Sequence, residues 1–215
     1  MYQSALARDD LPGTPSLSPN PALAQRVREY LRLTPQLPNP GAGRTYARWQ
    51  ALSKLGAASL PLAKVLEAHY DAVSIFSEAG QPLASNGAVW AVWAAGGPHD
   101  TVAYEASSST VSGIKPWCSA ELDVVTHALV TVRNGDRQPL AAVTLRQGCF
   151  ELDASQWHGP GMLGIPTGNG HFANAPARLL GEPEFYLQRP GFWHGGAGIA
   201  ACWYGAAAAI AEHVR

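Results

Sequence analysis

The chain has few charged residues, and their charges nearly cancel. Aspartate, glutamate, lysine and arginine make up 14% of its 215 residues, and the net charge is −1. This balance gives no basis for predicting binding to nucleic acid or to an anionic membrane, since both need clustered positive charge. Because 47% of the residues are apolar, much side-chain surface must pack against a core, another subunit or a ligand. The composition favours a small molecule or another protein chain as the partner.

Several patterns that mark other kinds of site are missing. Cys118, Cys149 and Cys202 stand far apart with no C-x-x-C pair, so we expect free thiols and neither a disulfide framework nor a cysteine zinc site. The histidines form no H-E-x-x-H or similar ligand pair, which leaves no basis for a metal site. No G-x-G-x-x-G run follows a strand with a helix behind it, and no G-x-S-x-G motif occurs. A Rossmann protein and an ordinary esterase are therefore disfavoured.

Long apolar runs are also lacking. No stretch reaches the roughly 20 apolar residues that span a membrane, and the first ten residues contain acidic side chains without the basic and apolar regions of a signal peptide. We therefore expect neither secretion nor membrane insertion. A reducing, cytoplasmic location is the expectation.

Residues 1–87 are predicted to form an N-terminal helical domain that begins with a proline-rich, loosely packed arm. Helices are expected at 21–32 and 43–57 and again after the capping residue Ser59, up to Gly80. No second ligand lies three or four positions from His69, so we expect a packed or hydrogen-bonded histidine. The third helix carries one apolar stripe formed by Leu62, Val65, Leu66, His69, Val73 and Phe76.

Residues 88–185 contain short β-rich runs separated by Gly, Pro, Asn and Asp, which predict an antiparallel barrel or sandwich. Asn134-Gly135-Asp136 is a strong hairpin-turn signal. Trp90 and Trp93 are expected in the core or an interface. Residues 186–215 read as one alanine-rich helix, the start of a C-terminal helical domain. The predicted fold class is thus α+β and multidomain: N-terminal helices, a central antiparallel β-barrel or sandwich, and the start of a helical bundle.

The segment 113–131 is the most informative part of the sequence. Gly113-Ile114-Lys115 is predicted to form a tight polar turn, followed by a strand in which Trp117 and Ser119 share one face. A flat ring and a hydroxyl on one face suit a flat heteroaromatic cofactor, which needs van der Waals contact and a directed hydrogen bond. The alternative is a core tryptophan beside a solvated serine.

The element order and the G-x-K-x-W-x-S run at Gly113, Lys115, Trp117 and Ser119 resemble the acyl-CoA dehydrogenase family over about residues 45–215. The resemblance implies that FAD and an acyl-CoA thioester lie between the β-domain and a C-terminal four-helix domain. It implies that Trp117 packs on the isoalloxazine and that the Ser119 hydroxyl reaches the flavin N5 and O4 edge.

A second segment also resembles the family. Gly161-Met162 with Thr167-Gly168 and Phe172 is similar to its late G-x-R-x-T-x-x-G-x-x-F segment. The resemblance implies that Thr167 and Gly168 line the cofactor, whereas the residues by themselves also fit a plain turn. Residues 181–207 resemble the entry into the C-terminal bundle.

The chain departs from the family's pattern at three places. Residues 92–98 replace the usual Thr-Glu-Pro loop, and Leu163 stands where arginine is common. The family's glutamate base belongs to the C-terminal bundle, of which only the first helix is expected here. Glu212 on that helix matches no base motif, so we assign no catalytic residue.

The sequence therefore predicts an FAD-binding, acyl-CoA dehydrogenase-like oxidoreductase of fatty acid metabolism, acting on CH–CH groups of acyl thioesters. Without the base-bearing bundle it would be incomplete, and a second copy of the chain or a partner chain would have to supply that bundle. The alternatives are a non-catalytic flavin- or acyl-CoA-binding module on the same scaffold and a longer natural sequence. Arg189 could contact a phosphate but is expected to be a surface guanidinium. Trp193 and His194 are expected to have structural roles.

Overall fold

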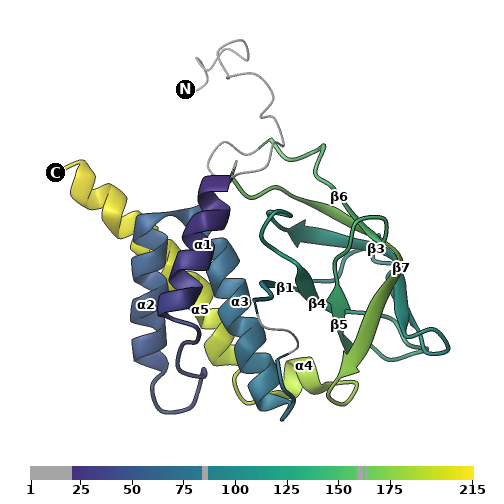
Figure 1. The fold of residues 1–215 in the computed structure, drawn as a ribbon. Helices are drawn as coiled ribbons and strands as arrows, with labels where there is room; N and C mark the ends of the chain where they lie inside the picture. The colour runs from purple at the N-terminus through teal and green to yellow at the C-terminus, as the bar shows by residue number, and fades with distance from the viewer. Residues whose placement is uncertain (1–20, 84–86, 159–161, 163) are drawn as a thin grey trace, which may run out of the picture.

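The computed structural model describes residues 21–83, 87–158, 162 and 164–215. A group of helices lies on one side of a curved sheet, as Figure 1 shows. The expected proline-rich arm, residues 1–20, lies outside the described residues. The helices are α1 (Pro21–Leu33), α2 (Thr45–Ala58), α3 (Leu60–Glu78), α4 (Phe185–Gln188) and α5 (Phe192–His213).

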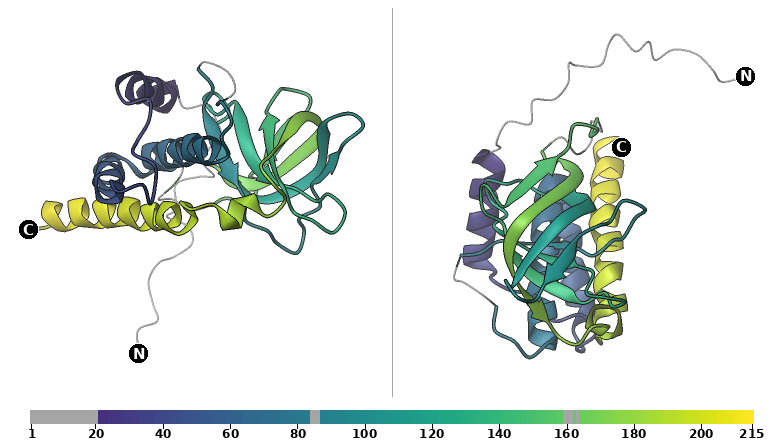
Figure 2. Two further views of the ribbon diagram at one scale, coloured as in Figure 1. Left: turned by 90° about the horizontal axis from the view of Figure 1, so that it is seen from below. Right: turned by 90° about the vertical axis from the view of Figure 1, so that its right-hand side faces the viewer.

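Helix α3 forms where the sequence predicted the third helix. The Ser59 Oγ accepts a hydrogen bond from the Leu62 backbone N–H at 3.4 Å, which satisfies one of the free donors of the first turn. Beyond the helix end, Gly80 adopts a φ of 63°, a conformation that glycine reaches without strain. The predicted apolar stripe is buried except at Val73, which is half-buried. Helix α3 thus lies in the centre of the molecule, between the other helices and the sheet (Figures 1 and 2).

Helices α2 and α5 approach each other closely because glycines line their contact. A Cβ at Gly205 would lie 1.9 Å from the Ser53 carbonyl oxygen, and one at Gly56 would lie 2.0 Å from that of Cys202. The left view in Figure 2 shows α5 passing beside α2 and extending away from the sheet. In the described part of the chain, no helix combines the length and the apolarity needed to cross a membrane.

The sheet has seven strands in the order β1-β4-β5-β7-β3-β2, with β6 also paired to β7. All pairs are antiparallel except β1 and β4, which are parallel. The expected strand-rich middle of the chain is therefore confirmed, but the sheet is mixed and its path is open, so it is not a closed antiparallel barrel. The predicted hairpin is present, with reciprocal backbone bonds between Asn134 and Arg137. The strands are β1 (Trp90–Trp93), β2 (Ala103–Glu105), β3 (Thr110–Ser119), β4 (His127–Thr131), β5 (Leu140–Thr144), β6 (Phe150–Asp153) and β7 (Thr167–Leu180).

The predicted polar turn at 113–115 is wrong, because these residues lie within β3. Gly113 has a φ of 121°, and a Cβ there would lie 2.6 Å from the Thr101 carbonyl oxygen. Lys115 is fully buried, and its Nζ donates to Asp100 Oδ2 at 2.6 Å and to Thr131 Oγ1 at 2.7 Å. The sequence showed a lysine among turn-forming residues, but a carboxylate 15 residues earlier compensates its charge inside the fold.

Candidate functional site

An apolar cavity of about 250 Å³ lies between α3, α5 and the β-domain. Most of its wall consists of aliphatic, aromatic and sulfur-containing side chains, with a few polar groups. A small molecule bound in such a cavity is largely removed from water, and the polar groups fix its orientation. The lining residues are Leu60, Ala63, Lys64, Glu67, Ser119, Trp157, Met162, Thr167, Ile199, Cys202 and Trp203.

Two hydroxyls face each other on this wall. Ser119 at the end of β3 pairs with Thr167 at the start of β7, and their side-chain oxygens lie 2.8 Å apart in a hydrogen bond that either can donate. Each hydroxyl carries one proton, so one proton joins the pair and the other is available to a ligand. The structure therefore brings together two residues that the resemblance implied separately for a cofactor site.

Trp117 lies on the surface beside this pair. Its side chain is 67% exposed, and its φ of 62° coincides with a bulge in the pairing of β3 with β7. A smaller cavity of about 30 Å³ is lined by Trp117 and Ser119 and also by Lys64, and Ser119 and Lys64 line the larger cavity too. The indole is thus open to solvent and next to the hydroxyl pair, as a stacking surface must be.

The neighbouring residues of the second resemblance have different positions. Gly168 pairs with Cys118 across the strands, and a Cβ at Gly168 would lie 1.9 Å from the Asp153 carbonyl oxygen. Close backbone packing therefore accounts for this glycine. Met162 lines the cavity, whereas Gly161 and Leu163 lie outside the described residues.

Glu67 is a site residue that the sequence reasoning missed. It lies on α3, is 9% exposed and lines the cavity. Burial, and to a smaller extent the charge of Asp71, raise the pKa of its carboxyl to about 7. The signal available in the sequence was an acidic residue between Ala63 and Tyr70, both of which face the core. Burial also raises the pKa of the Cys202 thiol, which lines the same cavity from α5, to about 12.

His69, Trp90 and Trp93 belong to the core, as expected. His69 Nδ1 accepts a hydrogen bond from the Trp90 backbone N–H at 3.3 Å, and burial lowers the pKa of this histidine to about 4. It is therefore neutral at pH 7. Trp90 and Trp93 are 1% and 4% exposed, and Trp93 stacks on Phe150 with ring centroids 5.3 Å apart. None of the three is placed to act on a ligand as an acid or base.

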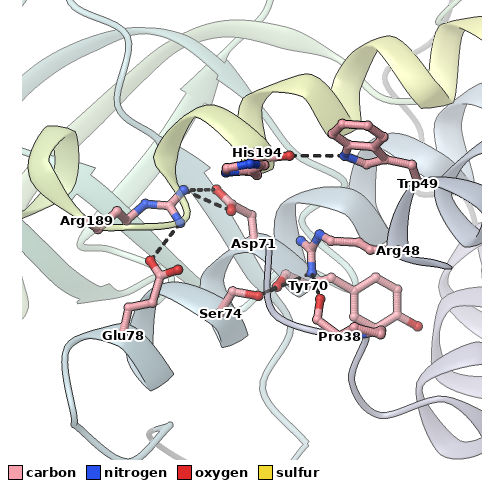
Figure 3. Close-up of polar contacts among 9 residues, drawn as sticks. All are labelled: Pro38, Arg48, Trp49, Tyr70, Asp71, Ser74, Glu78, Arg189 and His194. Atoms are coloured by element: carbon pink, nitrogen blue, oxygen red, sulfur yellow. Dashed lines mark hydrogen bonds and ion pairs between the residues drawn. The ribbon is translucent and has the colours of Figure 1, made fainter. Parts of the chain in front are cut away.

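The prediction of Arg189 as a surface guanidinium is wrong. Arg189 is 4% exposed, and its Nη2 donates to both carboxylate oxygens of Asp71, at 3.0 and 3.1 Å. Its Nη1 donates to Glu78 Oε2 at 3.1 Å, and Figure 3 shows the guanidinium held between these two α3 residues. The two carboxylates come from more than 100 residues earlier in the chain, so the local sequence gave no sign of them. Arg189 joins the approach to α5 to α3 and is not free for a phosphate.

Trp193 and His194 are close to this cluster at the start of α5. Trp193 is 81% exposed, and the His194 carbonyl oxygen accepts a hydrogen bond from Trp49 Nε1 at 3.1 Å (Figure 3). This bond joins the backbone at the start of α5 to α2, and a structural role for the His194 side chain stays a prediction. Glu212, near the end of α5, is exposed and does not line the cavity.

The described residues include no group of three or more histidine, cysteine or acidic side chains arranged to hold a metal ion. Cys118, Cys149 and Cys202 are free thiols, as expected. The cavity wall offers two hydroxyls, the Glu67 carboxyl group, the Lys64 amine, the Cys202 thiol and aromatic surfaces.

A helical layer and an open sheet with an apolar cavity between them define an α+β protein suited to enclosing a small molecule. No family model matches the sequence, and no curated protein matches it. The chain does match solved structures. A nitrososynthase from Micromonospora carbonacea var. africana matches 77% of this chain and 49% of its own, with 18% identity and a TM-score of 0.58.

Two further structures extend the comparison. TdsC from Paenibacillus sp. A11-2, solved with FMN and indole, matches 89% of this chain and 61% of its own, at 16% identity and a TM-score of 0.57. Butyryl-CoA dehydrogenase from Megasphaera elsdenii matches 74% of this chain and 49% of its own, at 17% identity and a TM-score of 0.52. The chain thus spans about half to six-tenths of the length of these proteins. The acyl-CoA dehydrogenase fold expected from the sequence is confirmed.

Proposed function

We propose that this chain forms the flavin- and acyl-thioester-binding part of an acyl-CoA dehydrogenase-like oxidoreductase. The observation that carries the proposal is the Ser119–Thr167 hydroxyl pair, which lines an apolar cavity beside the exposed Trp117 indole. The fold adds support, because the structures that share it include a butyryl-CoA dehydrogenase and an FMN complex.

The residues present fit a flavin ring. The exposed indole of Trp117 offers a flat apolar surface, and the unused proton of the hydroxyl pair can donate to an acceptor at the ring edge. Bound FAD would supply the hydride acceptor for oxidation of a CH–CH group. The chain's own part is to pack against the ring, to donate the hydrogen bond at Ser119 or Thr167, and to keep water away.

The cavity suits the acyl end of a thioester. Leu60 and Ile199 contribute aliphatic wall, and Met162, Trp157 and Trp203 contribute large polarisable surfaces. An acyl chain gains free energy by leaving water for such a wall, at about 25 cal/mol per Å² of apolar surface buried. An apolar wall also keeps water away from the reacting carbons.

A second protein segment is expected to complete the site. Helix α5 exposes large apolar side chains, two of which, Ile199 and Trp203, also line the cavity, and the solved structures that share the fold are longer than this chain. We propose that a second copy of the chain or a partner chain covers these side chains in the cytoplasm. The exposed side chains are Trp193, Ile199, Trp203, Tyr204 and Ile210.

The proposal is tested by flavin binding to the full chain. Purified protein with added FAD should retain a flavin absorbance band after gel filtration, and a parallel titration with FMN shows which flavin it prefers. Trp117→Ala should weaken flavin retention about two- to tenfold, since stacking on an indole contributes about 0.5–1.5 kcal/mol. Tyr46→Ala, which removes another exposed aromatic side chain, is the control and should leave retention unchanged. A folded, colourless preparation that ignores both flavins contradicts the proposal.

A non-catalytic binding module is the second candidate. It is favoured by the loop beside Trp117, where Gly97 lies close enough that a Cβ would be 3.7 Å from the indole Nε1. Residues 94–98 of this loop carry no hydroxyl or carboxylate that could assist a reaction. This candidate predicts that the FAD-bound chain reduces no dye with butyryl-CoA. Measurable turnover by the chain rejects it.

A further inference from the structure

Glu67 is a buried carboxyl group whose side chain has no hydrogen-bond partner among the described residues. It is 9% exposed and lines the same cavity as Ser119 and Thr167. A buried carboxyl group that serves only the fold is normally held by an arginine, a lysine or backbone N–H groups. Glu67 instead faces a space large enough for a ligand, so a bound molecule is the partner that the geometry leaves for it.

Titratable groups from several elements surround Glu67 and shift its pKa in opposite directions. On α3, Asp71 raises the pKa of Glu67 and Lys64 lowers it; Arg48 on α2 and Arg189 before α5 also lower it. Cys202 on α5 is near enough for Glu67 to raise the pKa of its thiol, and the same holds for the Tyr186 hydroxyl on α4. Desolvation is the largest influence and outweighs the cations, so the pKa of Glu67 lies at about 7.

A carboxyl group of this kind is suited to proton transfer. A general base works best when its pKa is near the working pH, because it is then both available as the base and strong enough to take the proton. The apolar wall around Glu67 also limits the water that would otherwise compete for its oxygens. No other acidic residue lines this cavity among the described residues.

We propose that Glu67 is the catalytic base of this cavity and removes the α-proton of the acyl thioester bound there. The step breaks the Cα–H bond of the thioester, the proton goes to a Glu67 carboxylate oxygen, and the electron pair remains on the thioester. This proposal rests on the proposed function. It assigns the catalytic base to a residue of this chain, whereas the sequence alone pointed to no candidate. Glu212 is excluded from this role by its exposed position.

Proton removal is measured without any oxidation. The full chain is incubated with butyryl-CoA in deuterated buffer, with and without FAD, and mass spectrometry follows deuterium incorporation at Cα. Wild type should exchange the α-hydrogens, with a rate that rises with pH through a midpoint near 7. Glu67→Gln should lower the exchange rate at least about 100-fold. Glu67→Asp should retain part of it with the same dependence on pH.

Binding of butyryl-CoA by calorimetry is the second readout. Glu67→Gln should bind it within about threefold of wild type, because the amide has nearly the shape of the carboxyl group and avoids the cost of burying a charge. Glu212→Gln is the control and should change neither binding nor exchange. Two outcomes overturn the role of Glu67 and leave the proposed function standing. In the first, Glu67→Gln exchanges deuterium as fast as wild type; in the second, the wild type binds butyryl-CoA but exchanges no deuterium. A wild-type chain that binds no butyryl-CoA overturns both.

Discussion

Glu67 and Asp71 lie one helical turn apart on α3 and are buried to nearly the same degree, with 9% and 8% exposure. Asp71 accepts two hydrogen bonds from Arg189, whereas no described residue donates to the Glu67 carboxyl. Both are carboxyl groups on the same helix, and they differ in the part of the protein that each one faces. Asp71 faces the arginine that leads into α5, and Glu67 faces the cavity.

The comparison separates a carboxylate used for the fold from one available to a ligand. A buried ion pair that loses one partner leaves an uncompensated charge in the core, so Asp71 and Arg189 are coupled in stability. Glu67 has no such partner to lose, and its negative charge opposes folding. Changes at the two positions should therefore act on stability with opposite signs.

The largest expected effect is at the paired group. Arg189→Met should destabilise the protein by about 3–5 kcal/mol, because Asp71 and Glu78 would both remain buried without their cation. Urea unfolding at pH 7 measures it. Arg189→Lys keeps the charge but not the forked geometry and should give a smaller loss. A loss under about 1 kcal/mol would show that the two carboxylates reach water.

The next effect is at the unpaired group and has the opposite sign. The pKa of Glu67 is raised in the folded state from 4.5 to about 7, so its charge opposes folding increasingly as pH rises from about 4.5 and fully above about 7. Glu67→Gln should therefore stabilise the protein above pH 7, on the order of 3 kcal/mol, and change little at pH 4. Unfolding midpoints across this pH range measure the difference.

The matched variant of that experiment is Asp71→Asn, which should destabilise the protein at pH 7 because it removes the charge that Arg189 faces. Equal effects of Glu67→Gln and Asp71→Asn, in sign and in pH dependence, would remove the distinction between the two carboxylates.

A smaller effect is expected where α5 packs against α2. Gly205→Ala should destabilise by about 1–3 kcal/mol, since its Cβ would lie 1.9 Å from the Ser53 carbonyl oxygen and the helices would have to separate. Gly196→Ala, on the same helix with no atom within 4 Å of the new Cβ, should stabilise by about 0.5–1 kcal/mol. Thermal unfolding of both variants measures the pair, and similar shifts would mean that α2 and α5 do not pack through glycine.

The smallest effect is expected at Trp117. Trp117→Gly should leave stability unchanged or raise it by up to about 1 kcal/mol, because glycine adopts the φ of 62° without strain and the indole is mostly exposed. The same variant should lose flavin retention. A large drop in melting temperature would instead place the indole in the core and weaken the flavin proposal.

Much of the helical domain followed from local sequence. The Ser59 cap, the apolar stripe of α3 and the turn at Gly80 are short-range features, and each predicted what the structure has. The hairpin at 134–136 was equally local. The parallel pairing of β1 with β4 was not, because the two strands are separated by β2 and β3 and their pairing depends on how the sheet packs.

The site was predictable in part. Trp117 and Ser119 became candidates because ring and hydroxyl are two residues apart, and Thr167 became one through the resemblance. Their meeting at 2.8 Å depends on the β3–β7 register. Glu67 was missed because an acidic residue on a helix is ordinarily solvated. Its place in the cavity wall depends on α5, from the other end of the chain, which supplies other residues of that wall.

The sequence by itself determined the order of the helices, the strand-rich character of the middle of the chain, and the turns at Gly80 and 134–136, since these depend on residues a few positions apart. The tertiary structure alone decided which charges are paired. Lys115 with Asp100, Arg189 with Asp71, and Glu67 with the open cavity are outcomes of long-range packing. The cost of burying a charge depends on its three-dimensional surroundings, which no local pattern contains.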